Sequence, residues 1–122
     1  MTDRLRSVER LLPLKPKVLH VLLAVADGPR HGYNIMQEVG ERTDGQVRLW
    51  PAALYGLLRE LEKADFIVES DHRPAAGQDD ERRRYFALTP LGKRVLEAEV
   101  RRLESIVTHA RSSRALRKAA RA

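Results

Sequence analysis

The sequence predicts a mainly α-helical protein with a small β-hairpin, an α+β fold, followed by a long C-terminal helix. Three observations carry this prediction. Residues 49–63 form an amphipathic pattern that starts at a proline, residues 66–88 hold two β-prone segments around a polar loop, and residues 90–110 carry a heptad pattern. Two further helical segments precede the first of these features. Three helices followed by a hairpin is the element order of a winged helix-turn-helix.

Composition narrows the class of protein. A chain of 122 residues is long enough for one domain with a real core and short enough to gain from dimerisation. It contains no cysteine, which excludes disulfides, thiolate metal sites and cysteine nucleophiles. The net charge of +6 favours a polyanionic partner such as DNA, although it would also suit a membrane surface. Because no signal-peptide core or membrane span is visible, we expect a cytoplasmic protein without a membrane partner.

Residues 1–16 are expected to be an N-terminal extension with a short helix over residues 2–12. Thr2 is its candidate N-cap, and the apolar side is formed by Leu5, Val8, Leu11 and Leu12. Two prolines between residues 13 and 16 end it. A helix this short is marginal alone, so it either docks on the protein or a partner subunit, or frays.

Residues 17–89 are expected to form the winged domain. Residues 17–26 are apolar on most sides and predict a buried helix, which a turn at Asp27-Gly28-Pro29 ends. Residues 31–43 predict a second helix, in which Gly32 would allow close packing and Tyr33 would fill core. A turn at Asp44-Gly45 and a short extended piece then lead into the third helix.

The third helix, residues 51–63, has two different faces. Leu54, Leu57, Leu58 and Leu61 form one apolar stripe, and Pro51 suits the first helical position. Small, hydrogen-bonding and cationic residues lie largely off the stripe: Ala52, Tyr55, Gly56, Arg59 and Lys63. Such a helix has the right shape for a DNA major groove. Alternatively, Tyr55 would be half-buried against the wing and Arg59 paired with Glu60 or Glu62.

The hairpin is expected over residues 66–70 and 83–88, with the polar loop 72–82 as the tip of the wing. Arg82, Arg83 and Arg84 end that loop and could reach phosphates or the minor groove, and Arg73 is a further candidate. Strand alternation points Arg83 and Arg84 to opposite faces, so the two cannot do the same job. The alternative is a solvated charge run paired with Asp79, Asp80 and Glu81.

Residues 90–112 are expected to form a dimerisation helix, capped by Thr89 and with Pro90 at the first position. A seam with steps of 4, 3, 4 and 3 runs through Leu96, Val100, Leu103, Val107 and Ala110. A matching helix of a second subunit would bury it, whereas packing on its own domain is the alternative. Residues 113–122 form a basic tail that we expect to fray.

Several strings in this chain resemble the PadR family of bacterial transcriptional regulators. These are residues 27–33 (DGPRHGY), residues 51–55 (PAALY) with 58–62 (LRELE), and residues 84–92 (RYFALTPLG), in the expected order and spacing. The resemblance covers roughly residues 18–96. It implies a dimeric winged-helix repressor whose third helix enters the major groove and whose hairpin is the wing.

Three departures from the family pattern bear on DNA recognition. Trp50 stands where a small polar residue usually precedes the proline, Ala52-Ala53 replaces Gly-Thr, and Asp65 stands at or beside a usual glycine. The candidate DNA-contact residues are Ala52, Ala53, Tyr55, Gly56, Arg59, Lys63, Arg73, Arg83 and Arg84. Trp50 could pack as an N-terminal staple, stack on a ligand, or lie at the DNA edge.

The function predicted from these features is a homodimeric, sequence-specific DNA-binding regulator, a repressor on a palindromic operator. The resemblance also implies a small-molecule or ionic effector, which no residue identifies. The alternative is a winged-helix protein-interaction module or adaptor. We expect no enzyme, because no nucleophile motif, phosphate loop or metal-ligand spacing is present, and no cofactor or metal.

Overall fold

The computed structural model describes residues 8–71 and 83–121. The predictions for Thr2 and Leu5, and those for Arg73, Arg82 and the acids of the wing loop, therefore lie outside the described residues. Within them, helices α2 (Pro16–Ala24), α3 (Gly32–Arg42) and α4 (Pro51–Lys63) come first. Strands β2 (Ile67–Ser70) and β3 (Tyr85–Leu88) follow, and then helices α5 (Pro90–Ser112) and α6 (Arg114–Arg121). This order confirms the predicted fold class.

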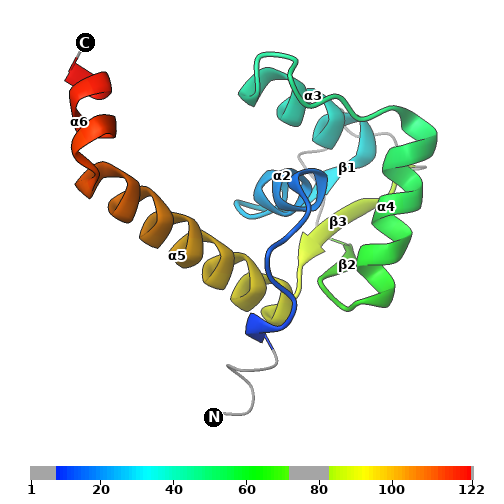
Figure 1. Ribbon diagram of the computed structural model, residues 1–122. Coiled ribbons are helices and arrows are strands. Elements are labelled where there is room, and N and C mark those ends of the chain that lie inside the picture. The colour runs from blue at the N-terminus through cyan, green and yellow to red at the C-terminus, as the bar shows by residue number, and fades with distance from the viewer. Residues whose placement is uncertain (1–7, 72–82, 122) are drawn as a thin grey trace.

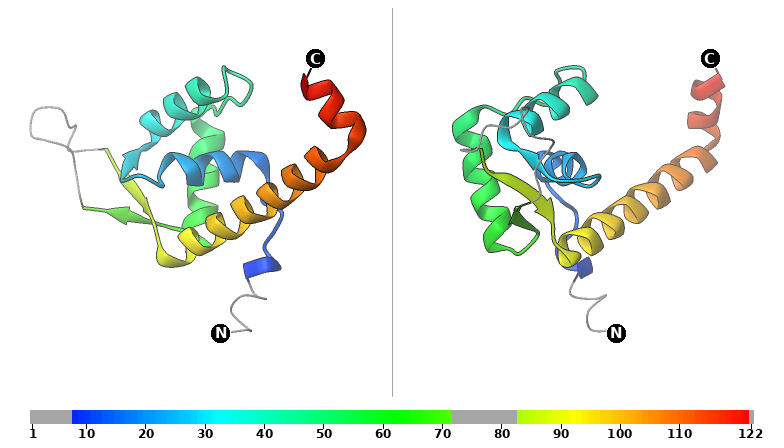
Figure 2. Two further views of the ribbon diagram at one scale, coloured as in Figure 1. Left: turned by 90° about the vertical axis from the view of Figure 1, so that its left-hand side faces the viewer. Right: turned by 180° about the vertical axis from the view of Figure 1, so that it is seen from behind.

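The arrangement in space has two parts (Figure 1). Helices α2, α3 and α4 pack together beside the small sheet, and α5 extends away from this body with α6 at its far end. Seen from a second side, the strands of the hairpin project away from α5 (Figure 2). The core is aliphatic apart from Phe66 and Phe86, and its members come from the three helices, the sheet and the start of α5. The winged body is thus one packed unit that carries a free helical arm.

The sheet has one strand more than the predicted hairpin. Its order is β1-β3-β2, all antiparallel, and β1 consists only of Arg30 and His31. His31 pairs with Tyr85, and Tyr85 pairs on its other side with Ser70. The segment just before α3 is therefore hydrogen-bonded to the wing, which fixes the wing against the helix-turn-helix.

Helices α3 and α4 both end in the same way. The residue after each C-cap has a left-handed backbone, with φ of 52° at Asp44 and 64° at Asp65. After α4, the Phe66 amide donates to the Leu61 carbonyl and the Asp65 amide to the Glu62 carbonyl, which is a Schellman motif. Because the left-handed region favours glycine, Asp65 stands in a conformation that glycine would adopt without steric cost.

The start of α5 packs closely on the end of that turn. Thr89 accepts a hydrogen bond from the Gly92 amide at 2.9 Å, as predicted for an N-cap, and donates its own hydroxyl proton to the Asp65 carbonyl. A β-carbon at Gly92 would overlap the carbonyl oxygen of Phe66. Glycine is therefore required where α5 crosses the entry to the wing.

The N-terminal segment is fastened to α5 by a buried carboxylate. Glu99 is only 1% exposed, accepts a hydrogen bond from the Leu14 amide at 2.7 Å, and pairs with Arg102. The Arg102 hydrogen bond lowers the pKa of Glu99, against the opposing effect of burial, and the Leu14 amide adds to the lowering. Val8 is also buried in the core. The described part of the N-terminal extension therefore docks on its own chain.

The C-terminal helices correct two expectations. Leu96 is 7% exposed and belongs to the core of its own domain, so the unburied part of the predicted seam begins at Val100. The first turns of α5 pack on the winged body, so the apolar residues there are buried within one protomer rather than in a dimer interface. Residues 114–121 form helix α6 rather than a frayed tail.

Candidate nucleic-acid interface

Helix α4 presents the two faces that its sequence predicts. Leu54, Leu58 and Leu61 are buried, and Leu57 is half-buried. On the other side Ala52, Ala53, Tyr55, Arg59 and Lys63 are exposed, and Gly56 is half-buried. The leucines hold the helix on the body, so the small, phenolic and cationic side chains are free to meet a partner.

Leu49, rather than Trp50, packs in the core at the start of α4. Pro51 occupies the first turn, and Leu49, one residue before the N-cap, is buried in the same core as Leu54. These two leucines stand at the positions of a hydrophobic staple. Trp50 is the N-cap and is 67% exposed, so the interpretation of Trp50 as the packed staple is wrong. The indole is instead available at the edge of the helix.

Tyr55 connects α4 to the start of α3. A β-carbon placed on Gly32 would lie 2.8 Å from the Tyr55 hydroxyl oxygen, so the ring rests directly over this glycine. The predicted close packing at Gly32 is thus present, and its partner is Tyr55. The tyrosine as a whole is 45% exposed, so part of its side chain stays open to a partner.

Arg59 does not make the ion pairs considered from the sequence. Within the residues that the structure describes, Arg59 forms no ion pair with Glu60 or Glu62. Glu62 binds Arg84 instead. Lys63, one turn further, is also exposed. Among the described residues neither cation has an ion pair to break before it donates to a phosphate.

The first turn of α3 adds an exposed tyrosine, Tyr33, to the surface beside α4. Tyr33 was expected in the core but is 59% exposed, because α3 turns its Gly32, Ile35 and Val39 side toward the body. Its ring stacks on His31 at a centroid distance of 6.5 Å, and His31 meets Tyr85 of β3 edge-on at 5.3 Å. His31 caps α3 by accepting from the Asn34 amide at 3.1 Å.

The two wing arginines, which lie just before β3, contact different groups. Arg83 lies with one guanidinium nitrogen 2.9 Å from Nε2 of His31. Arg84 binds Glu69 at 3.0 Å and Glu62 at 3.4 Å, and its guanidinium lies 5.1 Å from the centre of the Phe86 ring. The hydrogen bond to Glu69 is the main cause of its raised pKa. Arg84 therefore ties β2 and β3 to α4.

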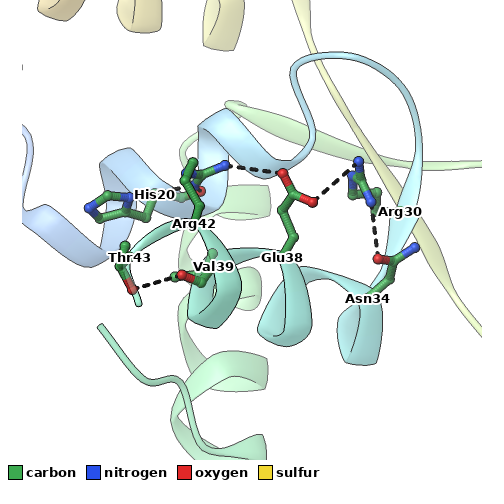
Figure 3. Close-up of polar contacts among 7 residues, drawn as sticks. All are labelled: His20, Arg30, Asn34, Glu38, Val39, Arg42 and Thr43. Carbon is green, nitrogen blue, oxygen red and sulfur yellow. Dashed lines mark hydrogen bonds and ion pairs between the residues drawn. The ribbon is translucent and has the colours of Figure 1, made fainter. Parts of the chain in front are cut away.

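A polar network orients α3 on α2 (Figure 3). Glu38 pairs with Arg30 at 3.6 Å and with Arg42 at 3.4 Å, and Arg42 donates to the His20 carbonyl at 2.8 Å. Burial, and then the charge of Arg42, lower the pKa of His20. Single surface pairs contribute little, but this chain of contacts links β1, α3 and α2 and so helps to hold α3 on α2.

Other kinds of site find no support in the described residues. Over residues 8–71 and 83–121, no group of three or more His, Asp or Glu side chains could hold a metal ion. No helix described here is long and apolar enough to cross a membrane. The site is a surface built from α4, the first turn of α3 and the base of the wing, which is the geometry of a winged-helix nucleic-acid interface.

Comparison with known proteins places the chain in a family. The sequence model of the transcriptional regulator PadR-like family matches residues 18–98. The chain therefore belongs to the PadR-like family of transcriptional regulators.

Relatives agree with this assignment. The transcriptional regulator Rv3488 of Mycobacterium tuberculosis is 34% identical over 88 residues, which cover 72% of this chain and 76% of that protein. An uncharacterized 37.1 kDa protein in transposon TN4556 of Streptomyces fradiae is 43% identical over 79 residues. That match covers 65% of this chain but only 20% of the longer protein.

Solved structures share the fold. A PadR family transcription regulator from Clostridium difficile superposes with a TM-score of 0.66 and 21% identity, covering 80% of this chain and 97% of that one. Bacillus subtilis PadR in complex with operator DNA gives a TM-score of 0.58 and 19% identity, covering 72% and 47% of the two chains. At these identities the likeness shows the fold alone.

Proposed function

We propose that this chain is a sequence-specific regulator that binds a palindromic operator as a homodimer and represses transcription. The single observation that carries the proposal is the exposed face of α4, where two alanines, a tyrosine and two cations that form no ion pair within the described residues lie opposite a buried leucine stripe. Family membership supports it, since the matched model is that of transcriptional regulators. Bacillus subtilis PadR, a structural neighbour, was solved with operator DNA.

Each candidate residue has a role in this proposal. Ala52, Ala53 and Gly56 let the helix backbone approach the bases, and Tyr55, Arg59 and Lys63 donate to phosphates or base edges. Arg83, together with Arg73 of the wing, reaches a neighbouring phosphate. Arg84 has a side chain that is 53% exposed, so its guanidinium can hold two carboxylates and still offer a donor to DNA. Trp50 lies at the DNA edge or stacks on a ligand.

The dimer would form along the uncovered part of α5. Val107 is 47% exposed and Ile106 is 51% exposed, which are high values for large apolar side chains on a helix. A groove of about 770 Å³ between α2, β3 and α5 is lined in part by Leu96 and Val100, so it continues the seam. The two subunits would bury each other's Val100, Leu103, Val107 and Ala110, and the two copies of α4 would then lie about 34 Å apart.

An effector that enters this groove would change the packing of α5 and hence the distance between the two copies of α4.

The test is selection of bound sequences from a random duplex library, followed by sequencing. A dimeric regulator should enrich two copies of one short motif in inverted orientation, with centres about one helical turn apart. A matched library selected with Arg59→Ala should lose enrichment at the positions that α4 reads. Enrichment of no motif would contradict the proposal and favour the protein-interaction module.

A further inference from the structure

A hollow lies between the end of α3 and the start of α4. Its volume is about 470 Å³, which is within the range of small-molecule sites. Its polar and aromatic lining comes from Gln37 and Glu41 of α3, Asp44 and Arg48 of the connecting chain, and Trp50 at the start of α4. We call it the α3–α4 hollow. It shares no lining residue with the groove between α2, β3 and α5, so the two are separate.

The chain that joins α3 to α4 (Figure 1) is held in place by its own hydrogen bonds. The Thr43 hydroxyl donates to the Val39 carbonyl at 2.8 Å and accepts from the Val47 amide at 3.0 Å. The Gly45 amide donates to the Gly40 carbonyl at 2.8 Å. The hollow is therefore formed before any ligand arrives, which lowers the entropic cost of binding one.

Trp50 contributes an exposed aromatic ring to the hollow. The residue is 67% exposed, although an indole is the largest side-chain ring and gains from burial. Within the described residues, no Lys or Arg side chain lies over this ring. The face of an indole attracts cations more strongly than the face of any other side-chain ring. The ring is thus available to a cation from outside the chain.

The charged groups of the hollow also favour a positive ligand. Glu41 and Asp44 are exposed, and neither carboxylate forms an ion pair within residues 8–71 and 83–121. Arg48 opposes them, but its Nε donates to the Gly45 carbonyl at 3.3 Å, so the guanidinium lies against the connecting chain. Two carboxylates and one guanidinium give the lining a net charge of −1, in a chain whose net charge is +6. Such a lining attracts a cation and repels a phosphate.

We propose that the α3–α4 hollow binds a small organic cation of the quaternary ammonium type. The indole of Trp50 lies against the cation, and Glu41 and Asp44 balance its charge. A metal ion does not fit this lining, because no group of three or more acidic or histidine side chains among the described residues could hold one. The inference goes beyond the proposed function, since the hollow lies within one protomer and needs no DNA.

Tryptophan fluorescence tests the proposal, because Trp50 is the only tryptophan of the chain. The full chain is titrated with choline at low salt, where the carboxylates are weakly screened, and sodium chloride corrects for ionic strength. The matched ligand is neohexyl alcohol, which has the shape of choline without its charge. Choline should give a saturable change in emission, and the alcohol should bind at least about 5-fold more weakly. Equal affinities, or no saturable change with choline, would overturn the proposal.

Two variants separate the contributions of charge and ring. E41Q/D44N removes both carboxylates and should weaken choline binding, whereas E60Q/E104Q removes two exposed acids elsewhere and should leave it unchanged. Asparagine accepts the left-handed backbone at position 44, where φ is 52°, so the connecting chain keeps its shape. Trp50→Leu keeps an apolar side chain without an aromatic face, and it should weaken binding measured by isothermal titration calorimetry. Circular dichroism checks that each variant is folded.

Three results with these proteins would contradict the site. Equal affinities of E41Q/D44N and E60Q/E104Q would show that the carboxylates of the hollow do not hold the cation. An unchanged affinity of Trp50→Leu would remove the ring from the site. A response of Trp50 fluorescence to duplex DNA but not to choline would assign the hollow to the DNA interface instead. Failure of the proposed function looks different: choline would still bind, but the protein would not distinguish operator from unrelated DNA.

Discussion

Tyr55 is the residue at which packing and DNA contact meet. Its ring and hydroxyl lie over Gly32 while the residue as a whole is 45% exposed, so packing by the ring and donation by the hydroxyl should be separable. Tyr55→Phe keeps the ring and removes the donor. Operator affinity should fall about 2- to 12-fold, the equivalent of about 0.5–1.5 kcal/mol for one hydrogen bond. The melting temperature should stay the same, as measured by circular dichroism; a large drop with unchanged affinity would assign the tyrosine to the core.

Asp65 holds a left-handed backbone that glycine adopts without steric cost. Asp65→Gly should therefore raise the free energy of unfolding by about 0.5–1 kcal/mol, after the added flexibility of the unfolded chain is counted. Ala64→Gly is the matched control, since residue 64 has φ of −76° and should lose about the same amount. Urea denaturation measures both. Destabilisation by both substitutions would show that the aspartate is not strained.

Two aromatic residues and one arginine show where sequence reasoning about single residues was limited. Tyr33 was assigned to the core, and packing was one of three alternatives for Trp50, yet both residues are mostly exposed. Helical spacing predicts which residues share a face, but it did not reveal that α3 turns Gly32 rather than Tyr33 toward the body. The pairing of Arg84 with Glu62 and Glu69 was also invisible, because it depends on where the wing lies against α4.

Among the elements, the link between the N-terminal segment and α5 gives a prediction about pH. Glu99 has a lowered pKa in the folded protein, so its contribution to stability is complete above its ordinary value near 4.5 and is lost as the pH falls through the lowered value. Glu99→Gln keeps an acceptor for Leu14 but removes the charge that binds Arg102. Between about pH 5 and pH 2, the unmodified protein should lose more stability than the variant.

Chemical denaturation across this range measures the difference. The substitution of an exposed acid, Glu97→Gln, serves as the control and should leave the pH dependence unchanged. Identical curves for Glu99→Gln and the unmodified protein would contradict a role for the ionised carboxylate.

Elements with strong local signals were predicted well. Pro51 and the Thr89-Pro90 pair marked two helix starts, and both are observed. Strand β1 was missed because two residues carry no periodic pattern and its pairing partner is distant in sequence. Helix α6 was predicted to fray because the segment 113–122 carries many cations and offers few apolar residues to bury.

For the whole molecule, the exposed apolar residues of α5 predict self-association. Leu103→Asp puts a charge into the proposed seam and should convert the dimer to a monomer, because a buried unpaired carboxylate is strongly unfavourable. Ser105→Asp, on an exposed position of the same helix, should leave the dimer intact. Analytical ultracentrifugation distinguishes the two states. A Leu103→Asp protein that stays dimeric would place the interface elsewhere.

The central claim is that α4 gives this protein a preference for particular DNA sequences. Fluorescence anisotropy tests it with a labelled duplex from upstream of the protein's own gene and an unrelated duplex of equal length, each titrated at low and high salt. We expect tighter binding to the upstream duplex at both concentrations, with salt weakening the unrelated duplex at least as much, because phosphate contacts are common to both. Equal affinities for the two duplexes at both salt concentrations would contradict sequence-specific regulation.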